Sequence, residues 1–349
     1  MDSRRMTIPT PPRRSRLGLY APVVLLLLLA LGWSGFWFYA RGRAGEAIDV
    51  AIAREAERGR NWSCADRSIG GFPFRIELRC ASLALTSTRW PETVRVETGP
   101  VLGVGQIYTP GQVILQATGP LRATLPEGRV LGASWTRLQA SLTHRSPEEF
   151  ALVASEPVLT LTAPDAPPGT WRASTMELHL RRNPTRPEDE QAVDLALTAN
   201  GTVLPEIDAL LGTSDPGTLD LRAILTKADS FRLGFNPDAL ESWRGAGGGL
   251  ELSKLASTKG PARLEASGRL LLDQTHRVAG QIQAGVAGID QIGGIRIGGL
   301  TAGLGGLLGG KPPAGAAPGL TTLPPVVLRE GRTYIGPFRL PLPPLAPLY

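Results

Sequence analysis

Very few residues of this chain have the types and the spacing that catalysis requires. The segment 305–311 follows the consensus of a phosphate-binding loop up to its lysine, but the next residue is Pro312. The hydroxyl that would hold Mg²⁺ is therefore missing, and no βαβ pattern surrounds the segment. We expect no nucleotide site here.

The other polar candidates are scattered. His144, His179 and His276 lie far apart in the sequence and lack the spacing of a metal-binding or nucleophilic set. The acidic groups Glu148–Glu149 and Glu188–Glu190 follow prolines, which is typical of solvated loops. The sequence therefore predicts no catalytic residue, no metal site and no cofactor, and we expect a protein that is not an enzyme.

Cys64 and Cys80 are the two cysteines of the chain, and they lie sixteen residues apart. If this part of the chain is exported, such a pair predicts a disulfide. In the chain-entropy account, a bridge closing this loop stabilises the fold by roughly 3 kcal/mol. The alternative is a pair of buried free thiols.

The run Gly71, Phe72, Pro73, Phe74 and Arg75 stands between the cysteines and is the most individual segment of the chain. Glycine permits a tight turn, and proline fixes φ beside two aromatic rings. We predict a rigid corner that packs both rings into the core. The alternative is a lip that contacts lipid.

The segment 17–40 carries no charged side chain and is long enough to cross a bilayer as a helix. Aromatic residues of the kind that gather at membrane interfaces mark its end: Trp33, Phe36, Trp37, Phe38 and Tyr39. Residues 1–16 contain five arginines and form a basic tail. This charge bias predicts a cytoplasmic N-terminus and a periplasmic bulk.

We therefore expect a single-pass protein of the inner membrane, with residues 41–60 as a helical stalk rich in Ala, Glu and Arg. The rival interpretation is a cleaved signal peptide. The apolar run exceeds the usual signal core of about 7–15 residues, and no clean A-x-A site follows Tyr39. An uncleaved anchor is the favoured interpretation.

The remaining chain, 61–349, is long enough for one large domain, or for two lobes with a boundary near 200–245. The net charge is +6, and the arginines before the apolar segment supply most of it. Basic patches interleaved with aromatic residues are missing, so we expect no nucleic-acid partner.

Alternating apolar and polar residues predict many short antiparallel strands with one wet face. Ile76, Leu78 and Cys80 alternate with charged residues, and a phase change just after them predicts a β-bulge near Cys80. Two long alternating runs, 262–272 and 278–286, predict a hairpin. The fold class is mainly β: a large antiparallel curved sheet or sandwich.

Other segments interrupt this pattern. Two short helices are expected at 205–211 and 237–243, and Asn200-Gly201 predicts a turn. The segment 289–310 has apolar residues at helical spacing but many glycines, each costing about 1 kcal/mol in a helix relative to alanine. We expect a marginal helix there, or a segment that is partly loop.

The order of several segments resembles one bacterial family. These segments are the anchor, Gly71–Leu78 between two cysteines, Gly248–Leu252, Gly260–Gly268 and Glu330–Pro337. The chain is similar over nearly its whole exported part to the family catalogued as domain of unknown function 2125. It resembles the AsmA-like envelope proteins more loosely.

The first resemblance implies no activity and no catalytic residue to carry over. The second implies one membrane anchor and a long periplasmic β-sheet whose curved groove serves lipid traffic or outer-membrane assembly. We therefore expect a protein that binds membrane lipid or assists envelope assembly. The alternatives are a scaffold that binds an envelope protein partner without a lipid, and a hydrolase with an unfamiliar site.

Overall fold

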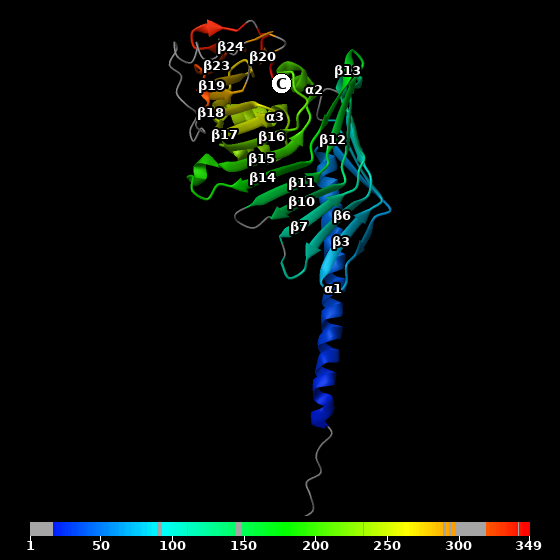
Figure 1. Ribbon diagram of the computed structural model, residues 1–349. Coiled ribbons are helices and arrows are strands. Elements are labelled where there is room, and N and C mark those ends of the chain that lie inside the picture. The colour runs from blue at the N-terminus through cyan, green and yellow to red at the C-terminus, as the bar shows by residue number, and fades with distance from the viewer. Residues whose placement is uncertain are drawn as a thin grey trace, which may run out of the picture.

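The computed structural model describes residues 17–88, 93–109, 111–143, 148–232, 234–288, 291–292, 295–296, 319–340 and 342–349. The chain begins there with one long helix, α1 (Leu17–Glu57), which projects from one end of a strand-rich body (Figure 1). Within the described residues, α1 is the one helix whose length and composition would allow it to cross a membrane.

A sixteen-stranded antiparallel sheet dominates the described residues, and we call it the large sheet. In spatial order its strands are β2 (Ser68–Gly70), β3 (Arg75–Cys80), β6 (Val101–Gln106), β7 (Gln112–Ala117), β10 (Arg137–Thr143), β11 (Glu149–Ser155), β14 (Thr175–Arg182), β15 (Val193–Thr202), β16 (Gly217–Leu225), β17 (Leu250–Lys259), β18 (Ala262–Leu272), β19 (Val278–Ala287), β23 (Val326–Arg329), β24 (Arg332–Ile335) and β25 (Phe338–Arg339), with β22 (Thr321–Thr322) beside β19.

Seven further strands form a second antiparallel sheet, the small sheet. Its spatial order is β1 (Arg60–Ala65), β4 (Ser82–Ser87), β5 (Val94–Thr98), β8 (Leu121–Thr124), β9 (Val130–Ser134), β12 (Val158–Ala163) and β13 (Ala166–Arg172). The remaining elements are α2 (Pro205–Leu211), α3 (Pro237–Gly245), the 3₁₀ turns η1 (Pro126–Gly128), η2 (Glu188–Glu190) and η3 (Ala228–Phe231), and the strand pair β20 (Gln291–Ile292) and β21 (Ile295–Arg296).

The two sheets are joined along a crease. From β3 to β14 the chain passes back and forth between them, two strands at a time. Backbone hydrogen bonds continue through the crease, as from Thr118 N to Pro100 O at 2.8 Å. Gly99 is required there, because a Cβ at this position would stand 2.7 Å from the Thr118 carbonyl oxygen.

The crease shows that the β-bulge predicted near Cys80 is wrong. The phase change after Cys80 is not a β-bulge, because β3 pairs with β6 without a register shift. The chain instead leaves the large sheet at Ala81 and enters the small sheet with β4. A sequence pattern cannot distinguish the two, because both shift the alternation by one residue.

Each sheet has one apolar face, and we call these the inner faces. On the large sheet, directly paired residues form an inner row: Leu78, Leu115, Leu152, Leu178, Leu197 and Leu221, with Gly103 and Ala140 between them. On the small sheet a matching row runs through Trp62, Leu85, Val96, Ala123, Leu131 and Leu161. The opposite face of the large sheet carries mostly polar side chains.

The C-terminal strands and α3 form a closed lobe with a core of their own. Leu240 and Trp243 of α3 pack on Leu272, and Phe231 and Tyr349 lie against them. Asn236 caps α3 by accepting a hydrogen bond from the Ala239 amide at 3.0 Å, and Pro237 occupies the first turn. This lobe lies at the end of the large sheet that is farthest from the apolar part of α1 (Figure 1).

The predicted fold class is confirmed, as are the two short helices and the long hairpin, which is β18–β19. Asn200-Gly201 is not a turn, because β15 continues through it with a register shift. The helix expected at 289–310 is wrong where the structure describes it, since Gln291–Ile292 and Ile295–Arg296 pair as strands. The rest of that segment lies outside the described residues.

Candidate functional site

The inner faces are accessible along most of their length. Between Arg60 and Val203, among the described residues, no Val, Leu, Ile, Met, Phe or Trp side chain is buried. The buried apolar side chains there are all small: Cys80, Ala123, Ala154, Pro157, Ala192 and Ala199. A sheet of this size whose large apolar side chains all stay partly exposed has no closed core of its own.

Several inner-face side chains are well exposed, with 41% for Leu115, 47% for Leu142 and 37% for Trp62. The closed lobe of the same sheet differs sharply, because Leu252 and Leu272 are each 7% exposed. The change occurs where α3 and η3 cover the sheet. The inner faces are therefore uncovered in the region from β3 to β15.

A pocket of about 280 Å³ marks the far end of this uncovered region. Leu142, Phe150, Leu180, Leu195 and Leu225 line it, and η3 closes one side with Phe231. The wall is thus predominantly apolar, which is the usual character of a site for a hydrophobic ligand.

Charged residues stand at the rim of this pocket. Asp229 lies 2.8 Å from Arg182 and 3.2 Å from Arg232. Burial raises the pKa of Asp229, but the hydrogen bonds from both arginines outweigh it and hold the pKa below its ordinary value. The rim is therefore ionised and polar where the pocket meets solvent.

The polar face carries a second recess, of about 560 Å³, over β7 to β17. Two of its charged groups form an ion pair, because Arg181 lies 3.2 Å from Asp194. His179 lies 3.5 Å from Glu177 on the same face. Pairs of this kind on an exposed face are ordinary surface electrostatics.

The junction of α1 with the sheets involves the Gly71–Arg75 segment. Trp33 donates a hydrogen bond to the Pro73 carbonyl at 2.8 Å, and Trp37 donates one to the Arg75 carbonyl at 3.0 Å. The Trp37 ring meets the Phe72 ring edge to face at 5.4 Å between centroids. The segment therefore docks onto the aromatic end of α1.

This geometry overturns the predicted packing of both rings into the core. Phe72 is 55% exposed and Phe74 is 59% exposed. Gly71, at φ 100°, permits the turn, because a Cβ there would stand 2.7 Å from the Arg75 carbonyl oxygen. The corner exists, but it packs against the helix and leaves much of each ring accessible.

The other residues predicted at the membrane interface divide into two groups. Trp37 is 3% exposed and belongs to the junction. Phe36, Phe38 and Tyr39 are about half exposed or more, although the Phe38 ring also stacks on the Phe72 ring at 6.4 Å between centroids. Rings in these positions are available to a surrounding bilayer.

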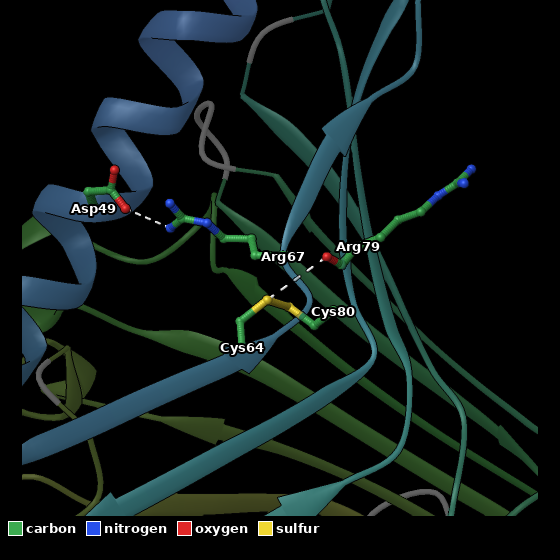
Figure 2. Close-up of a disulfide and its surroundings, with 5 residues drawn as sticks. All are labelled: Asp49, Cys64, Arg67, Arg79 and Cys80. Carbon is green, nitrogen blue, oxygen red and sulfur yellow. Dashed lines mark hydrogen bonds and ion pairs between the residues drawn. A yellow bond between two sulfur atoms is a disulfide. The ribbon is translucent and has the colours of Figure 1, made fainter.

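The predicted disulfide between Cys64 and Cys80 is confirmed, with a Cα–Cα distance of 5.2 Å (Figure 2). Cys64 pairs across to Leu83 on the inner face of the small sheet, and Cys80 pairs across to Val101 on that of the large sheet. The bridge therefore ties the two sheets together at the crease, beside the ion pair of Asp49 in α1 with Arg67 at 2.6 Å (Figure 2).

The described residues contain no group of three His, Cys, Asp or Glu side chains able to hold a metal ion. His179 lies on β14, and His276 lies in the β18–β19 turn against Tyr349. His144 and the segment 305–311 lie outside the described residues.

Sequence reasoning did not identify the inner row as a site. Its signal was present, since the alternation of leucines predicted an apolar face on each strand. What could not be predicted was whether anything covers that face.

The apolar N-terminal helix, as anchor or signal, and the disulfide together indicate an extracytoplasmic location for the strand-rich body. A comparison with curated proteins found no match, and a comparison with solved structures found none either. Over residues 37–343 the chain matches DUF2125, described as an uncharacterized protein conserved in bacteria. Because this match covers most of the chain, including both sheets, the protein belongs to the DUF2125 family.

Proposed function

We propose that this protein is a non-enzymatic lipid-binding protein of the bacterial envelope. It is anchored in the inner membrane by α1, with its N-terminus in the cytoplasm and its sheets in the periplasm. The space between the inner faces holds acyl chains. The single observation that carries the proposal is the absence of a buried large apolar side chain between Arg60 and Val203 among the described residues.

The anchor is supported by the junction. Trp33 of α1 bonds to the turn before β3 and Trp37 bonds to the first residue of β3, so the apolar helix is joined to the folded body by specific contacts. A signal peptidase cut after Tyr39 would remove both indoles and leave Phe72 without its partner ring. An uncleaved helix keeps these contacts, whereas a disposable signal sequence has no need of them.

Lipid is the ligand class that suits the inner faces. Burying apolar surface stabilises by about 25 cal/mol per Å², and the accessible leucines extend over strand after strand. A long flexible apolar ligand can follow such a row, whereas a compact ligand would leave most of it in water. The ionised rim at Arg182, Asp229 and Arg232 is suited to a polar headgroup.

The test uses the whole chain in vesicles. Its two cysteines are joined in the disulfide, so Leu178→Cys can be labelled singly with bimane. Leu178 lies five strand spacings from β3, about 24 Å along the sheet at about 4.8 Å per strand. A bilayer that surrounds the anchor does not reach it.

Phospholipids with brominated acyl chains should quench the bimane at Leu178→Cys. The matched control is Glu177→Cys, the neighbouring residue on the polar face of β14. Strong quenching at 178 and weak quenching at 177 is the expected result. Equal quenching at both positions, or none at 178, would contradict the binding of lipid between the inner faces and favour a scaffold without a lipid ligand.

A further inference from the structure

A second group of exposed aromatic residues lies at the bilayer end of the large sheet. Tyr108, in the β6–β7 turn, is 66% exposed. The amide of Ile107 donates a hydrogen bond to the Phe74 carbonyl at 3.3 Å, so this turn lies directly beside the docking segment. We call Phe72, Phe74 and Tyr108 the lip.

The depth of the lip follows from its contacts with α1. From Leu17, the first residue after the basic tail, to Trp37 the helix rises about 30 Å at about 1.5 Å per residue. That rise equals the thickness of a bilayer's hydrocarbon core, about 30 Å. Trp33 and Trp37 therefore stand at the outer boundary of the hydrocarbon.

The two phenylalanine rings of the lip stand at the same level. The Phe74 ring lies 5.9 Å from the Trp33 ring, and the Phe72 ring lies 5.4 Å from the Trp37 ring. Aromatic side chains favour this boundary, where one side is apolar and the other is wet. The lip thus continues the aromatic belt of the helix onto the folded body.

The side chains next to the lip suit the headgroup layer. Arg75 is 60% exposed in its side chain and lies 2.5 Å from Glu77, which also contacts Arg79. Two arginines share one buried carboxylate, so the pair retains a net positive charge beside the lip. Cations at this level can reach lipid phosphates while their stems stay in contact with apolar surface.

We propose that the lip is seated in the outer leaflet of the bilayer that α1 crosses. This inference rests on the anchor of the proposed function and does not require that lipid occupy the inner faces. The seating holds the strand ends of β3 and β7 against the leaflet. The inner-face residues Ile76 and Val113, on these strands, then face the site from which an acyl chain would leave the bilayer.

The test measures depth directly. Tyr108→Cys, at an exposed turn position, is spin-labelled in the full chain in nanodiscs of phosphatidylethanolamine and phosphatidylglycerol. Gln274→Cys, in the exposed β18–β19 turn of the closed lobe, is the matched control. Accessibility to oxygen, which concentrates in the bilayer, is compared with accessibility to a water-soluble nickel chelate.

The label at 108 is expected to show oxygen access and several-fold lower nickel access than the label at 274. Equal nickel access at the two positions would overturn the seating of the lip. The bimane experiment reports on lipid at Leu178 and not on the lip, so the two proposals fail separately. Quenching at 178 together with high nickel access at 108 would contradict the seating of the lip. The proposal that lipid lies between the inner faces would be unaffected.

Discussion

The indole nitrogen of Trp37 donates a hydrogen bond to the backbone carbonyl of Arg75 across 3.0 Å. This bond joins a helix that can cross a membrane to the first long strand of a sixteen-stranded sheet. Trp37 is 3% exposed although it lies at the end of an otherwise exposed apolar helix. The sheet therefore starts from a fixed position relative to the anchor.

Removing this link should loosen the turn. Trp37→Phe deletes a hydrogen bond worth about 1 kcal/mol, which corresponds to roughly fivefold more frequent local opening. Hydrogen exchange of the peptide covering 70–76, measured on the full chain in nanodiscs, should rise by that factor. Tyr39→Phe, at an exposed neighbouring ring, serves as the control and should change nothing. An unaltered exchange rate in Trp37→Phe would show that the indole bond does not hold the turn.

The disulfide should stabilise the crease. Replacing both cysteines in Cys64→Ala/Cys80→Ala removes a bridge across sixteen residues, worth roughly 3 kcal/mol in the chain-entropy account. The urea midpoint of the body, followed by tryptophan fluorescence, should fall. A reductant should lower the midpoint of the wild-type chain to the same value and leave the double variant unaffected. Identical midpoints for wild type and variant would contradict this role.

Two leucines on the same inner face should respond differently to truncation. Leu195 is half-buried in the uncovered region, whereas Leu252 is 7% exposed, two strands away in the closed lobe. We expect Leu252→Ala to cost about 2–5 kcal/mol, as in a packed core. Leu195→Ala should cost less than Leu252→Ala, because part of the Leu195 side chain remains exposed to solvent. Equal shifts in the urea midpoint would mean that the inner face is closed.

The C-terminal tail is held by a carboxylate with a low pKa. Hydrogen bonds from Arg244 and Tyr349 lower the pKa of Glu241 from 4.5 to about 2. Since the folded pKa lies below the ordinary value, the contribution of Glu241 is complete above 4.5 and is lost as the pH falls through about 2.

At about pH 3.5, below the ordinary pKa but above the folded one, part of this contribution should therefore already be lost. Protection of the peptide 342–349 against hydrogen exchange, corrected for intrinsic rates, should be lower at this pH than at neutral pH. Glu241→Gln should lower the protection at neutral pH and remove the part of the pH dependence that Glu241 causes. A wild-type tail whose protection changes with pH no more than that of Glu241→Gln would indicate an ordinary pKa for Glu241.

Most of the fold could be predicted from the alternation of apolar and polar residues along the strands. The inward leucines of β14 to β19 were predictable, because one face of each strand packs on neighbours and the other meets water. The crease was not, because β3 and β4 belong to different sheets although Ala81 alone separates them. The short strands β1 and β2 and the proline-bearing β13 were also missed, since their sequences lack a clean alternation.

The contact between α1 and the Gly71–Arg75 segment could not be predicted for a different reason. The aromatic residues of 33–39 and the Gly71–Arg75 segment were each predicted to be special, but the contact between them was not predicted. Phe72 meets Trp37 across 35 positions of sequence, and no local pattern encodes such a pairing. The Cys64–Cys80 bridge could be predicted because its partners were the two cysteines of the chain.

We propose that acyl chains occupy the space between the inner faces. The most direct measurement is photo-crosslinking in living cells, with a benzophenone amino acid at Leu178 and, in a matched variant, at Glu177. The two side chains lie on opposite faces of β14. We expect mass spectrometry to find phospholipid adducts on the full chain at 178 and far fewer at 177. Adducts at 178 that consist of protein alone, or equal lipid adducts at both positions, would contradict it.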